Sequence, residues 1–233
     1  MKAISYYKER LAAERLRRVY EIAPPRVQRY LDAELDYVLA GIRPGDAVLE
    51  LGCGYGRILG SVARKARFAV GIDLSVASLS FGKPLLAAYS NCGLAAMDAH
   101  RLGFRDGAFD VVLCIQNGIS AFKIDPLTLM KESLRVVRPG GTAFFSSYSS
   151  RFWDDRLEWF RLQAAAALVG EIDDDQTRDG VIVCNDGFKA RTIGPADFLS
   201  LAERLGVEAQ VEEVDGSSIF CSIKPAVRAS RAN

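Results

Sequence analysis

Five short apolar runs, separated by segments of helical character, constrain the fold of this chain more than any other feature of its 233 residues. The runs cover residues 47–51, 68–72, 94–97, 108–115 and 142–148. Their apolar residues do not alternate with polar ones, which is typical of strands buried on both faces. Because a sheet of such strands needs helices on both sides, the pattern predicts a doubly wound α/β domain.

The end of the chain predicts two further strands, at residues 207–214 and 219–223, after a helix at 195–205. Only a short Asp-Gly-Ser link at 215–217 lies between them. A parallel pair needs a crossover of about a dozen residues or more, so this link makes the two strands antiparallel. The predicted fold is a doubly wound, mostly parallel seven-stranded sheet with an antiparallel C-terminal hairpin.

The segments on either side of the predicted sheet strands divide the chain into parts. Pro24-Pro25 separates two N-terminal helices, because a proline disfavours helix in the residue before it. After the fifth strand, a helix at 153–169 and a hairpin around the Asn-Asp-Gly turn at 185–187 form an insertion. The expected parts are a helical cap (1–44), a Rossmann-like domain (45–148 and 194–225), a lid insertion (149–193) and a disordered tail (226–233).

Composition narrows the expected partners. The chain has 30 basic and 29 acidic side chains and a formal net charge of +1, which does not favour nucleic acid as the main partner. One histidine and five scattered cysteines, with no C-x-x-C pair, predict no metal site. No apolar run approaches the roughly 20 residues that span a bilayer, and the polar N-terminus is unlike a signal peptide. We expect a cytoplasmic monomer or homodimer without a membrane partner.

A glycine-rich loop follows the first predicted strand and leads into a helix. Its sequence is Glu50-Leu51-Gly52-Cys53-Gly54-Tyr55-Gly56. Backbone N–H groups and the helix dipole at such a helix start attract a polar or anionic ligand, and glycines let the ligand touch the main chain. A glycine pair alone is equally compatible with a tight strand-to-helix turn that binds nothing.

Two aspartates at the ends of the next two predicted strands favour a ligand. Asp73 ends the second strand and Asp98 the third, so both lie at the sheet edge that carries the glycines. Ligands of open α/β sheets bind outside the carboxyl ends of the strands. Asp73 can accept hydrogen bonds from two ribose hydroxyls, and Asp98 can accept one from an adenine amino group. Each aspartate alone could simply cap a helix; together with the glycines they predict a nucleoside-containing cofactor.

These motifs resemble those of the class I, Rossmann-like S-adenosylmethionine-dependent methyltransferases. The resemblance covers about residues 45–148 and, by topology, the last two strands. The matching stretches are 48–56 (VLELGCGYG), 71–75 (GIDLS), 97–104 (MDAHRLGF), 109–112 (FDVV) and 135–141 (RVVRPGG). It implies S-adenosylmethionine as the cofactor and S-adenosylhomocysteine as the product.

The resemblance also implies roles for particular residues. Glu50, Gly52 and Gly54 contact the methionyl end of the cofactor, within a binding loop that includes Cys53 and Tyr55. Asp73 binds the ribose and Leu74 packs on adenine. Further along the chain, the implied cofactor contacts are Asp98 and Ala99 at the adenine edge, and Gln116 and Asn117 near the transferable methyl group.

The loop also resembles the G-x-G-x-x-G fingerprint of nicotinamide-binding proteins, but departs from it. The third glycine, Gly56, follows Gly54 after one residue instead of two, and Glu50 precedes the first. The antiparallel final hairpin is likewise similar to methyltransferases and not to dehydrogenases. The sequence therefore favours methyl transfer over hydride transfer.

No catalytic acid or base is evident in the sequence. Methyl transfer from a sulfonium is an in-line displacement, and orientation alone can remove about 7–11 kcal/mol of barrier. The stretch after the fourth strand is Ile115-Gln116-Asn117-Gly118 and lacks the Asn-Pro-Pro-Tyr motif of amide-methylating enzymes. His100 and Cys53 are more simply a loop histidine and a small loop side chain than a base and a nucleophile.

The predicted function is S-adenosylmethionine-dependent methylation of an N, O or S atom of a small-molecule acceptor. Aromatic side chains of the helical cap and the lid are the candidate acceptor pocket: Tyr7, Tyr20, Tyr148, Trp153 and Phe188. Two alternatives stay open. One is an RNA or protein methyltransferase that docks through its basic first helix; the other is a non-catalytic S-adenosylmethionine-binding module.

Overall fold

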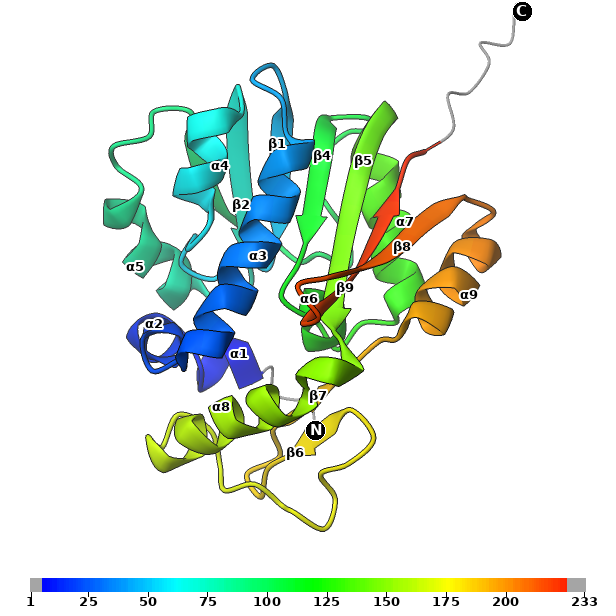
Figure 1. Ribbon diagram of the computed structural model, residues 1–233. Helices are drawn as coiled ribbons and strands as arrows, with labels where there is room; N and C mark the ends of the chain where they lie inside the picture. The colour runs from blue at the N-terminus through cyan, green and yellow to red at the C-terminus, as the bar shows by residue number, and fades with distance from the viewer. Residues whose placement is uncertain (1–5, 226–233) are drawn as a thin grey trace, which may run out of the picture.

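The computed structural model describes residues 6–225. It contains one seven-stranded sheet, whose strands lie side by side across Figure 1. The strand order is β3-β2-β1-β4-β5-β9-β8. Its members are β1 (Ala47–Leu51), β2 (Phe68–Asp73), β3 (Cys92–Ala96), β4 (Phe109–Cys114), β5 (Val137–Tyr148), β8 (Ala209–Val214) and β9 (Ser218–Ile223). Strands β1 to β5 are parallel to one another, and β9 pairs antiparallel with both β5 and β8. The predicted fold class is confirmed.

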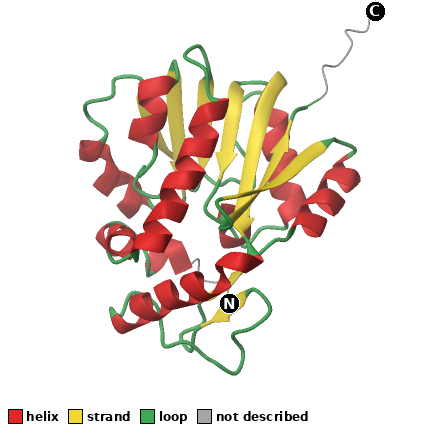
Figure 2. Cartoon of the chain, viewed as in Figure 1, coloured by secondary structure: helices red, strands yellow, loops and turns green. Residues whose placement is uncertain are grey.

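Helices cover both faces of the sheet, as the cartoon in Figure 2 shows. On one face lie α3 (Pro25–Gly41), α4 (Leu59–Lys65) and α5 (Val76–Leu85). On the other lie α6 (Gly118–Ala121), α7 (Pro126–Val136) and α9 (Pro195–Leu205). Because both faces are covered, every residue of β1 is buried. This double burial explains why the strands read as unbroken apolar runs.

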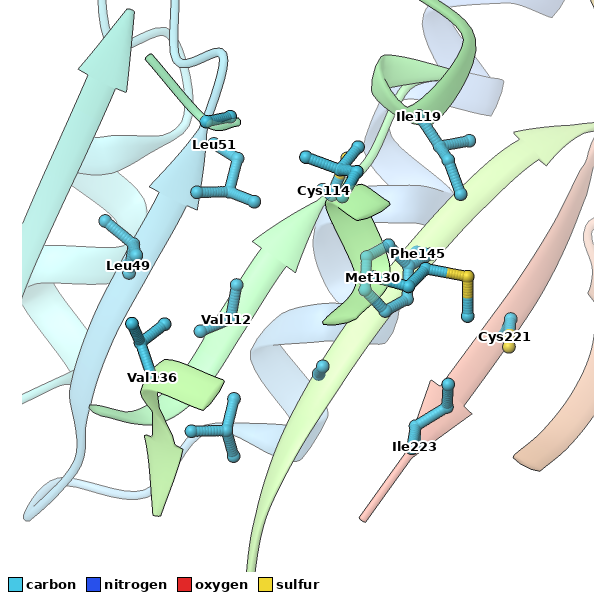
Figure 3. Packing of buried hydrophobic residues seen from close by; sticks show 14 of the residues in the cluster. Leu49, Leu51, Val112, Cys114, Ile119, Met130, Val136, Phe145, Cys221 and Ile223 are labelled. Atoms are coloured by element: carbon cyan, nitrogen blue, oxygen red, sulfur yellow. The ribbon is translucent and has the colours of Figure 1, made fainter. Parts of the chain in front are cut away.

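Figure 3 shows the packing beneath α7, where aliphatic side chains of β1 and β4 meet Met130 and Phe145. Leu49 and Val112 are fully buried there, and burial of such a side chain contributes about 1.5–3 kcal/mol. Cys114 and Cys221 lie in the same core and are free thiols. They act as small apolar side chains, as their positions in apolar runs predict.

The Pro139-Gly140-Gly141 stretch before the predicted fifth strand has the composition of a sharp turn, but a prediction of a turn there is wrong. Strand β5 begins at Val137 and continues through these residues, and its register against β4 shifts between Phe109 and Val111. Gly140 takes a left-handed φ of 79°, which turns the strand without ending it. A glycine-rich strand irregularity and a turn have the same sequence signature.

The N-terminal region contains three helices and not the two that were predicted. Helix α1 (Tyr6–Glu9) and helix α2 (Glu14–Glu21) are separated by a break at Ala13, whose φ is 52°. The Ala13 N–H donates to the Ser78 hydroxyl of α5 at 2.9 Å. This contact attaches the broken segment to the domain beside the glycine loop.

Helix α8 (Trp153–Ala165) is shorter than predicted, because Ala167 takes a left-handed φ of 53° and ends it. The predicted hairpin is confirmed as β6 (Val181–Val183) and β7 (Lys189–Arg191). Among residues 6–225, no helix is both long and apolar enough to cross a membrane. The predicted disordered tail, 226–233, lies outside the described residues.

The predicted helical cap and lid insertion share one apolar core. Tyr6, Leu11 and Val19 from the N-terminal helices pack with Trp159 and Phe188 from the insertion. Helix α3 is divided between two cores: its first half joins this one, and its second half packs on the sheet. We call α1, α2, the first half of α3, α8, the short 3-10 helix Ser150–Phe152 and the β6–β7 hairpin the cap layer, and it lies below the carboxyl ends of the strands in Figure 1.

Candidate active site

One cavity lies between the carboxyl ends of the central strands and the cap layer. The loops after β1, β2 and β4 line one half, which we call the sheet half. The opposite, cap half is lined by Tyr7, Tyr30, Tyr148, Trp159, Phe160 and Gln163. The cavity lies outside the carboxyl ends of the strands, which is where open α/β sheets bind their ligands.

The glycine loop after β1 forms the floor of the sheet half. Gly52 and Gly54 have φ values of 69° and 56°, in the left-handed region that favours glycine. A Cβ on Gly52 would lie 2.8 Å from the Phe122 ring, and one on Gly54 would lie 2.7 Å from Leu16 Cδ2. Both the backbone torsions and the close neighbours therefore require glycine at these positions.

Asp73 joins the glycine loop to the end of β2. One carboxylate oxygen accepts the Gly54 N–H at 2.9 Å, and the other accepts the Ser75 N–H at 2.7 Å. Burial raises the pKa of Asp73, although these backbone hydrogen bonds act in the opposite direction. A carboxylate oxygen can accept more than one hydrogen bond, so both oxygens keep capacity for a ligand in the cavity.

Glu50 and Arg57 place a carboxyl group and a guanidinium on the sheet half, and polar atoms of both lack hydrogen-bond partners among residues 6–225. Glu50 is 8% exposed, and its Oε2 has no hydrogen-bond partner among the described residues. Arg57 Nε and Nη2 are likewise buried without partners in that part of the chain, and its guanidinium lies 4.8 Å from the centre of the Tyr20 ring. Burial raises the pKa of Glu50 to about 8, while Arg57 opposes this rise and Asp73 adds to it. Unpaired buried charged groups are costly, so this pair is suited to a ligand with both charges.

Gln116 is fixed at the end of β4 by a buried glutamate from α3. The Gln116 N–H donates to Glu34 Oε2 at 2.9 Å and to the Ser146 hydroxyl at 2.8 Å. The Gln116 side chain reaches the cavity, where its Oε1 accepts the Tyr20 hydroxyl at 3.2 Å. Glu34 also accepts the Ser218 hydroxyl at 2.7 Å, and burial raises its pKa to about 7. This glutamate was not predicted, although it interrupts the apolar stripe of its helix.

Comparison with known proteins gives the family. Residues 48–141 match the family model described as "Methyltransferase domain". The match begins in β1 and contains the glycine loop, Asp73 and Gln116. This region is therefore a methyltransferase domain, and the comparisons support the class I, S-adenosylmethionine-dependent type.

Among its relatives is the 2-methyl-6-phytyl-1,4-hydroquinone methyltransferase of a Synechocystis strain, which is 32% identical over 142 residues. That alignment covers 57% of this chain and 43% of the relative. This methyltransferase chain spans about half the length of the first curated relatives it matches.

Solved structures share the fold along almost the whole chain. The PH0226 protein from Pyrococcus horikoshii OT3 is 21% identical, with a TM-score of 0.66, and covers 96% of this chain and 99% of its own. The DhpI-SAM-HEP complex is 18% identical, with a TM-score of 0.60, and covers 97% of this chain and 100% of that one. Similarity at these identities concerns the fold alone.

The residues predicted from the methyltransferase resemblance divide into two groups. The structure brings together eight of them on the sheet half of the cavity: Glu50, Gly52, Cys53, Gly54, Tyr55, Asp73, Leu74 and, at the end of β4, Gln116. Burial raises the pKa of the Cys53 thiol strongly, so it is held as a neutral side chain. Its burial fits the expectation that it is a small loop residue and not a nucleophile.

Asp98, Ala99 and Asn117 do not line this cavity. Asp98 is exposed just beyond β3 and accepts the His100 N–H at 2.9 Å, while Ala99 is buried in the core. The Asn117 side chain is already bonded on both sides: it accepts the Ser147 hydroxyl at 2.8 Å and donates to the Arg191 carbonyl at 3.0 Å. Asn117 thereby connects β5 to the β6–β7 hairpin.

The predicted acceptor residues divide in the same way. Tyr7, Tyr20 and Tyr148 line the cavity, whereas Trp153 and Phe188 do not. Phe188 lies behind Tyr7, with ring centres 5.9 Å apart. The ring of Trp153 lies beside the buried Arg156 guanidinium, 5.8 Å from its centre. Trp159 and Phe160 also line the cap half, and both belong to the aromatic side chains that the lid segment offers for an acceptor pocket. Tyr30, which lies in the apolar stripe of its helix, and Gln163, a polar residue of α8, line it too and were not predicted.

Proposed function

We propose that this chain binds S-adenosylmethionine in the sheet half of the cavity and transfers its methyl group to an N, O or S atom of a small molecule. The observation that carries the proposal is that Glu50 Oε2 and two nitrogens of Arg57, Nε and Nη2, are buried without hydrogen-bond partners among residues 6–225. The methionyl end of the cofactor carries an ammonium and a carboxylate, which complement these two groups. A nicotinamide dinucleotide offers no ammonium to Glu50.

The remaining sheet-half residues fit the rest of the cofactor. Asp73 keeps hydrogen-bonding capacity for two ribose hydroxyls, and Leu74 presents an apolar side chain beside it. Asp98 and Ala99 lie beyond the end of the neighbouring strand β3, where an adenine edge would extend out of the cavity. Gly52 and Gly54 let the cofactor reach the main chain. The Asn117 side chain is already bonded to Ser147 and to the Arg191 carbonyl, so it is not among the cofactor contacts that we propose.

The cofactor supplies an activated methyl group on a sulfonium sulfur, and the protein supplies alignment. Orientation contributes about 7–11 kcal/mol when both reactants are held in line. Gln116 and Tyr20, bonded to each other, meet at the border between the two halves. Leu11 and Trp159 from the cap layer are almost fully buried against the cavity and exclude water from it. No residue in this scheme has to act as a strong base.

The cap layer favours a small acceptor over a macromolecule. The Arg15 guanidinium of α2 donates to the Ala167 and Leu168 carbonyls after α8, at 2.6 and 3.1 Å, and so connects the two sides of the cap layer. RNA or a protein segment would need an open face at the methyl group. The hydroquinone named for the Synechocystis relative is also a small molecule. Five free cysteines, four of them buried, fit work in a reducing, cytoplasmic compartment.

Titration calorimetry with S-adenosylmethionine, S-adenosylhomocysteine and NADH tests the cofactor assignment. We expect the first two to bind and NADH not to bind. Asp73→Ala should weaken the binding of both by at least tenfold, and the exposed control Asp175→Ala should not. A preference for NADH, or equal binding by the Asp73 variant, would refute the assignment.

Transfer of a labelled methyl group tests the reaction. The wild-type protein, supplied with labelled S-adenosylmethionine, should label the small-molecule fraction of a cell extract and not its RNA or protein. Label in RNA or protein would favour the macromolecular alternative. Tight cofactor binding with no label in any fraction would favour a non-catalytic binding module.

A further inference from the structure

The cap half of the cavity contains a buried polar group that nothing in residues 6–225 satisfies. Gln163 Nε2 belongs to a side chain that is 2% exposed and has no hydrogen-bond partner in that part of the chain. The Tyr30 side chain is 1% exposed, and its hydroxyl interacts with Tyr148, which adds to the raised pKa of Tyr30. An unsatisfied buried donor costs about 1–3 kcal/mol, so Gln163 is expected to meet a ligand.

The amide nitrogen restricts what that ligand presents. Gln163 Nε2 can donate hydrogen bonds and cannot accept them, whereas a tyrosine hydroxyl does both. The partner must therefore offer a lone pair at this point. An ammonium group has no lone pair and would leave Gln163 unsatisfied.

A buried cation next to the Tyr148 ring also favours a ligand that presents a lone pair to the cap half. Arg156 is fully buried, and its guanidinium lies 4.3 Å from the centre of the Tyr148 ring. It donates to the Gly180 carbonyl at 3.1 Å and to the Ala190 carbonyl at 3.0 Å, and it makes no ion pair with any described carboxylate. Its charge is compensated only by carbonyl dipoles and aromatic rings.

The carboxyl groups near the cavity are placed away from the Tyr148 ring that Arg156 contacts. Glu50 and Asp73 line the sheet half. Glu34 does not line the cavity, and its oxygens accept from Gln116 and Ser218, although its charge still raises the pKa of Tyr30 and Tyr148. A ligand against the Tyr148 ring therefore lies next to the Arg156 cation, which favours a partial or full negative charge there.

The walls define the shape of the ligand. Tyr7, Tyr148, Trp159 and Phe160 line the cap half with aromatic rings, and the Trp159 N–H is already used by the Val19 carbonyl at 3.0 Å. Burial raises the pKa of Tyr148 to about 12, so this wall is uncharged at neutral pH. Such surfaces suit a flat, largely apolar molecule.

We propose that the cap half binds an aromatic acceptor through an oxygen, a phenol or enol, and excludes amines that carry a positive charge. Gln163 donates to that oxygen, Tyr30 completes its hydrogen bonding, and Arg156 stabilises negative charge on it across the Tyr148 ring. Gln163 is therefore a specificity-determining residue. In the transfer step an O–CH₃ bond forms, the S–CH₃ bond breaks with its electron pair remaining on sulfur, and the hydroxyl proton leaves to water. This assignment rests on the proposed function.

Ligand binding to the protein saturated with S-adenosylhomocysteine tests the assignment. The probes are 1-naphthol and 1-naphthylmethylamine, which match in ring system and differ in oxygen against ammonium. The variants are Gln163→Leu and Gln163→Glu, and the exposed Gln210→Leu is the matched control. We expect the wild type and the control to bind naphthol and not the amine.

Loss of the donor should weaken naphthol binding by about tenfold in Gln163→Leu. Gln163→Glu should weaken it further and admit the amine, because the carboxylate attracts a cation. Both variants should keep the affinity of the wild type for S-adenosylhomocysteine. Gln163→Leu removes an unsatisfied donor, so its thermal midpoint should not fall.

The results separate this inference from the proposed function. Failure of the wild type to bind S-adenosylhomocysteine would overturn the proposed function itself. Three other results, each obtained with normal cofactor binding, would overturn only the assignment of an oxygen acceptor. These are equal affinity for the two probes, no binding of naphthol, and unchanged naphthol binding in both Gln163 variants.

Discussion

Replacing Glu50 by glutamine should make the free protein more stable and its cofactor binding weaker. Glutamine keeps the size of the side chain and removes the charge. Glu50 is buried and unpaired at Oε2, and burial raises its pKa from about 4.5 to about 8. A group that binds a ligand often lowers the stability of the free protein, and we expect Glu50 to do both.

The effect on stability depends on pH in a defined direction. A raised carboxyl pKa contributes stability that is fully present below about pH 4.5 and is lost as the pH rises to about 8. A difference of about 3.5 pH units, at about 1.4 kcal/mol each, sets an upper limit of about 5 kcal/mol on this loss. The buried amide of glutamine costs about 1–3 kcal/mol. The net gain of Glu50→Gln should therefore be about 2–4 kcal/mol above pH 8, and near pH 4.5 the variant should instead be less stable than the wild type by about the 1–3 kcal/mol that the buried amide costs.

The effect on binding has the opposite sign. A hydrogen bond to a charged group contributes about 1.5–3 kcal/mol, so Glu50→Gln should weaken S-adenosylhomocysteine binding by about 10- to 150-fold. Wild-type Glu50 must lose a proton to pair with the ligand ammonium. Its affinity should therefore rise as the pH increases to about 8, and that of the variant should not.

Calorimetric titration between about pH 6 and pH 9 measures the affinity, and urea unfolding over the same range and down to about pH 4.5 measures stability. Glu203→Gln, an exposed exchange of the same type on α9, is the control and should change neither quantity. The reasoning would be refuted by a wild-type affinity that is flat with pH. It would also be refuted by a variant that is less stable than the wild type above pH 8.

Three further substitutions test other parts of the structure. Gly54→Ala introduces a Cβ 2.7 Å from Leu16 Cδ2 at a positive φ. It should lower the free energy of unfolding by about 1–3 kcal/mol and weaken cofactor binding at least tenfold in calorimetry. Adding Leu16→Ala should restore part of the lost affinity, and no restoration would contradict a clash between the two side chains. Phe145→Ala should lower the free energy of unfolding by about 3–5 kcal/mol in urea, with a loss under 1 kcal/mol contradicting its place in the core. Tyr20→Phe removes the bond to Gln116 and should slow methyl transfer by about two- to tenfold at unchanged stability; an unchanged rate would show that this bond does not align the reactants.

The fold could be predicted almost completely because its signals are local. Residues 47–51 and 195–205 were predicted with the bounds that the structure has, since an unbroken apolar run and a proline-started amphipathic stretch each determine one element. The errors occurred where one signature has two outcomes. The glycines at 140–141 bend a strand instead of ending it, and Ala13 breaks a helix without a glycine or proline.

The sequence by itself determined the strands, the glycine loop and Asp73, because these lie within two consecutive strand-loop-helix units, whose geometry follows from local pattern. Only the tertiary structure decided which side chains share the cavity. It placed Tyr30, Gln163 and Arg57 at or around that space and turned Trp153, Phe188 and Asn117 away from it. The cavity forms between segments more than a hundred residues apart in the chain, and the orientation of each side chain depends on how the cap layer packs as a whole. Residue type and spacing alone do not predict that packing.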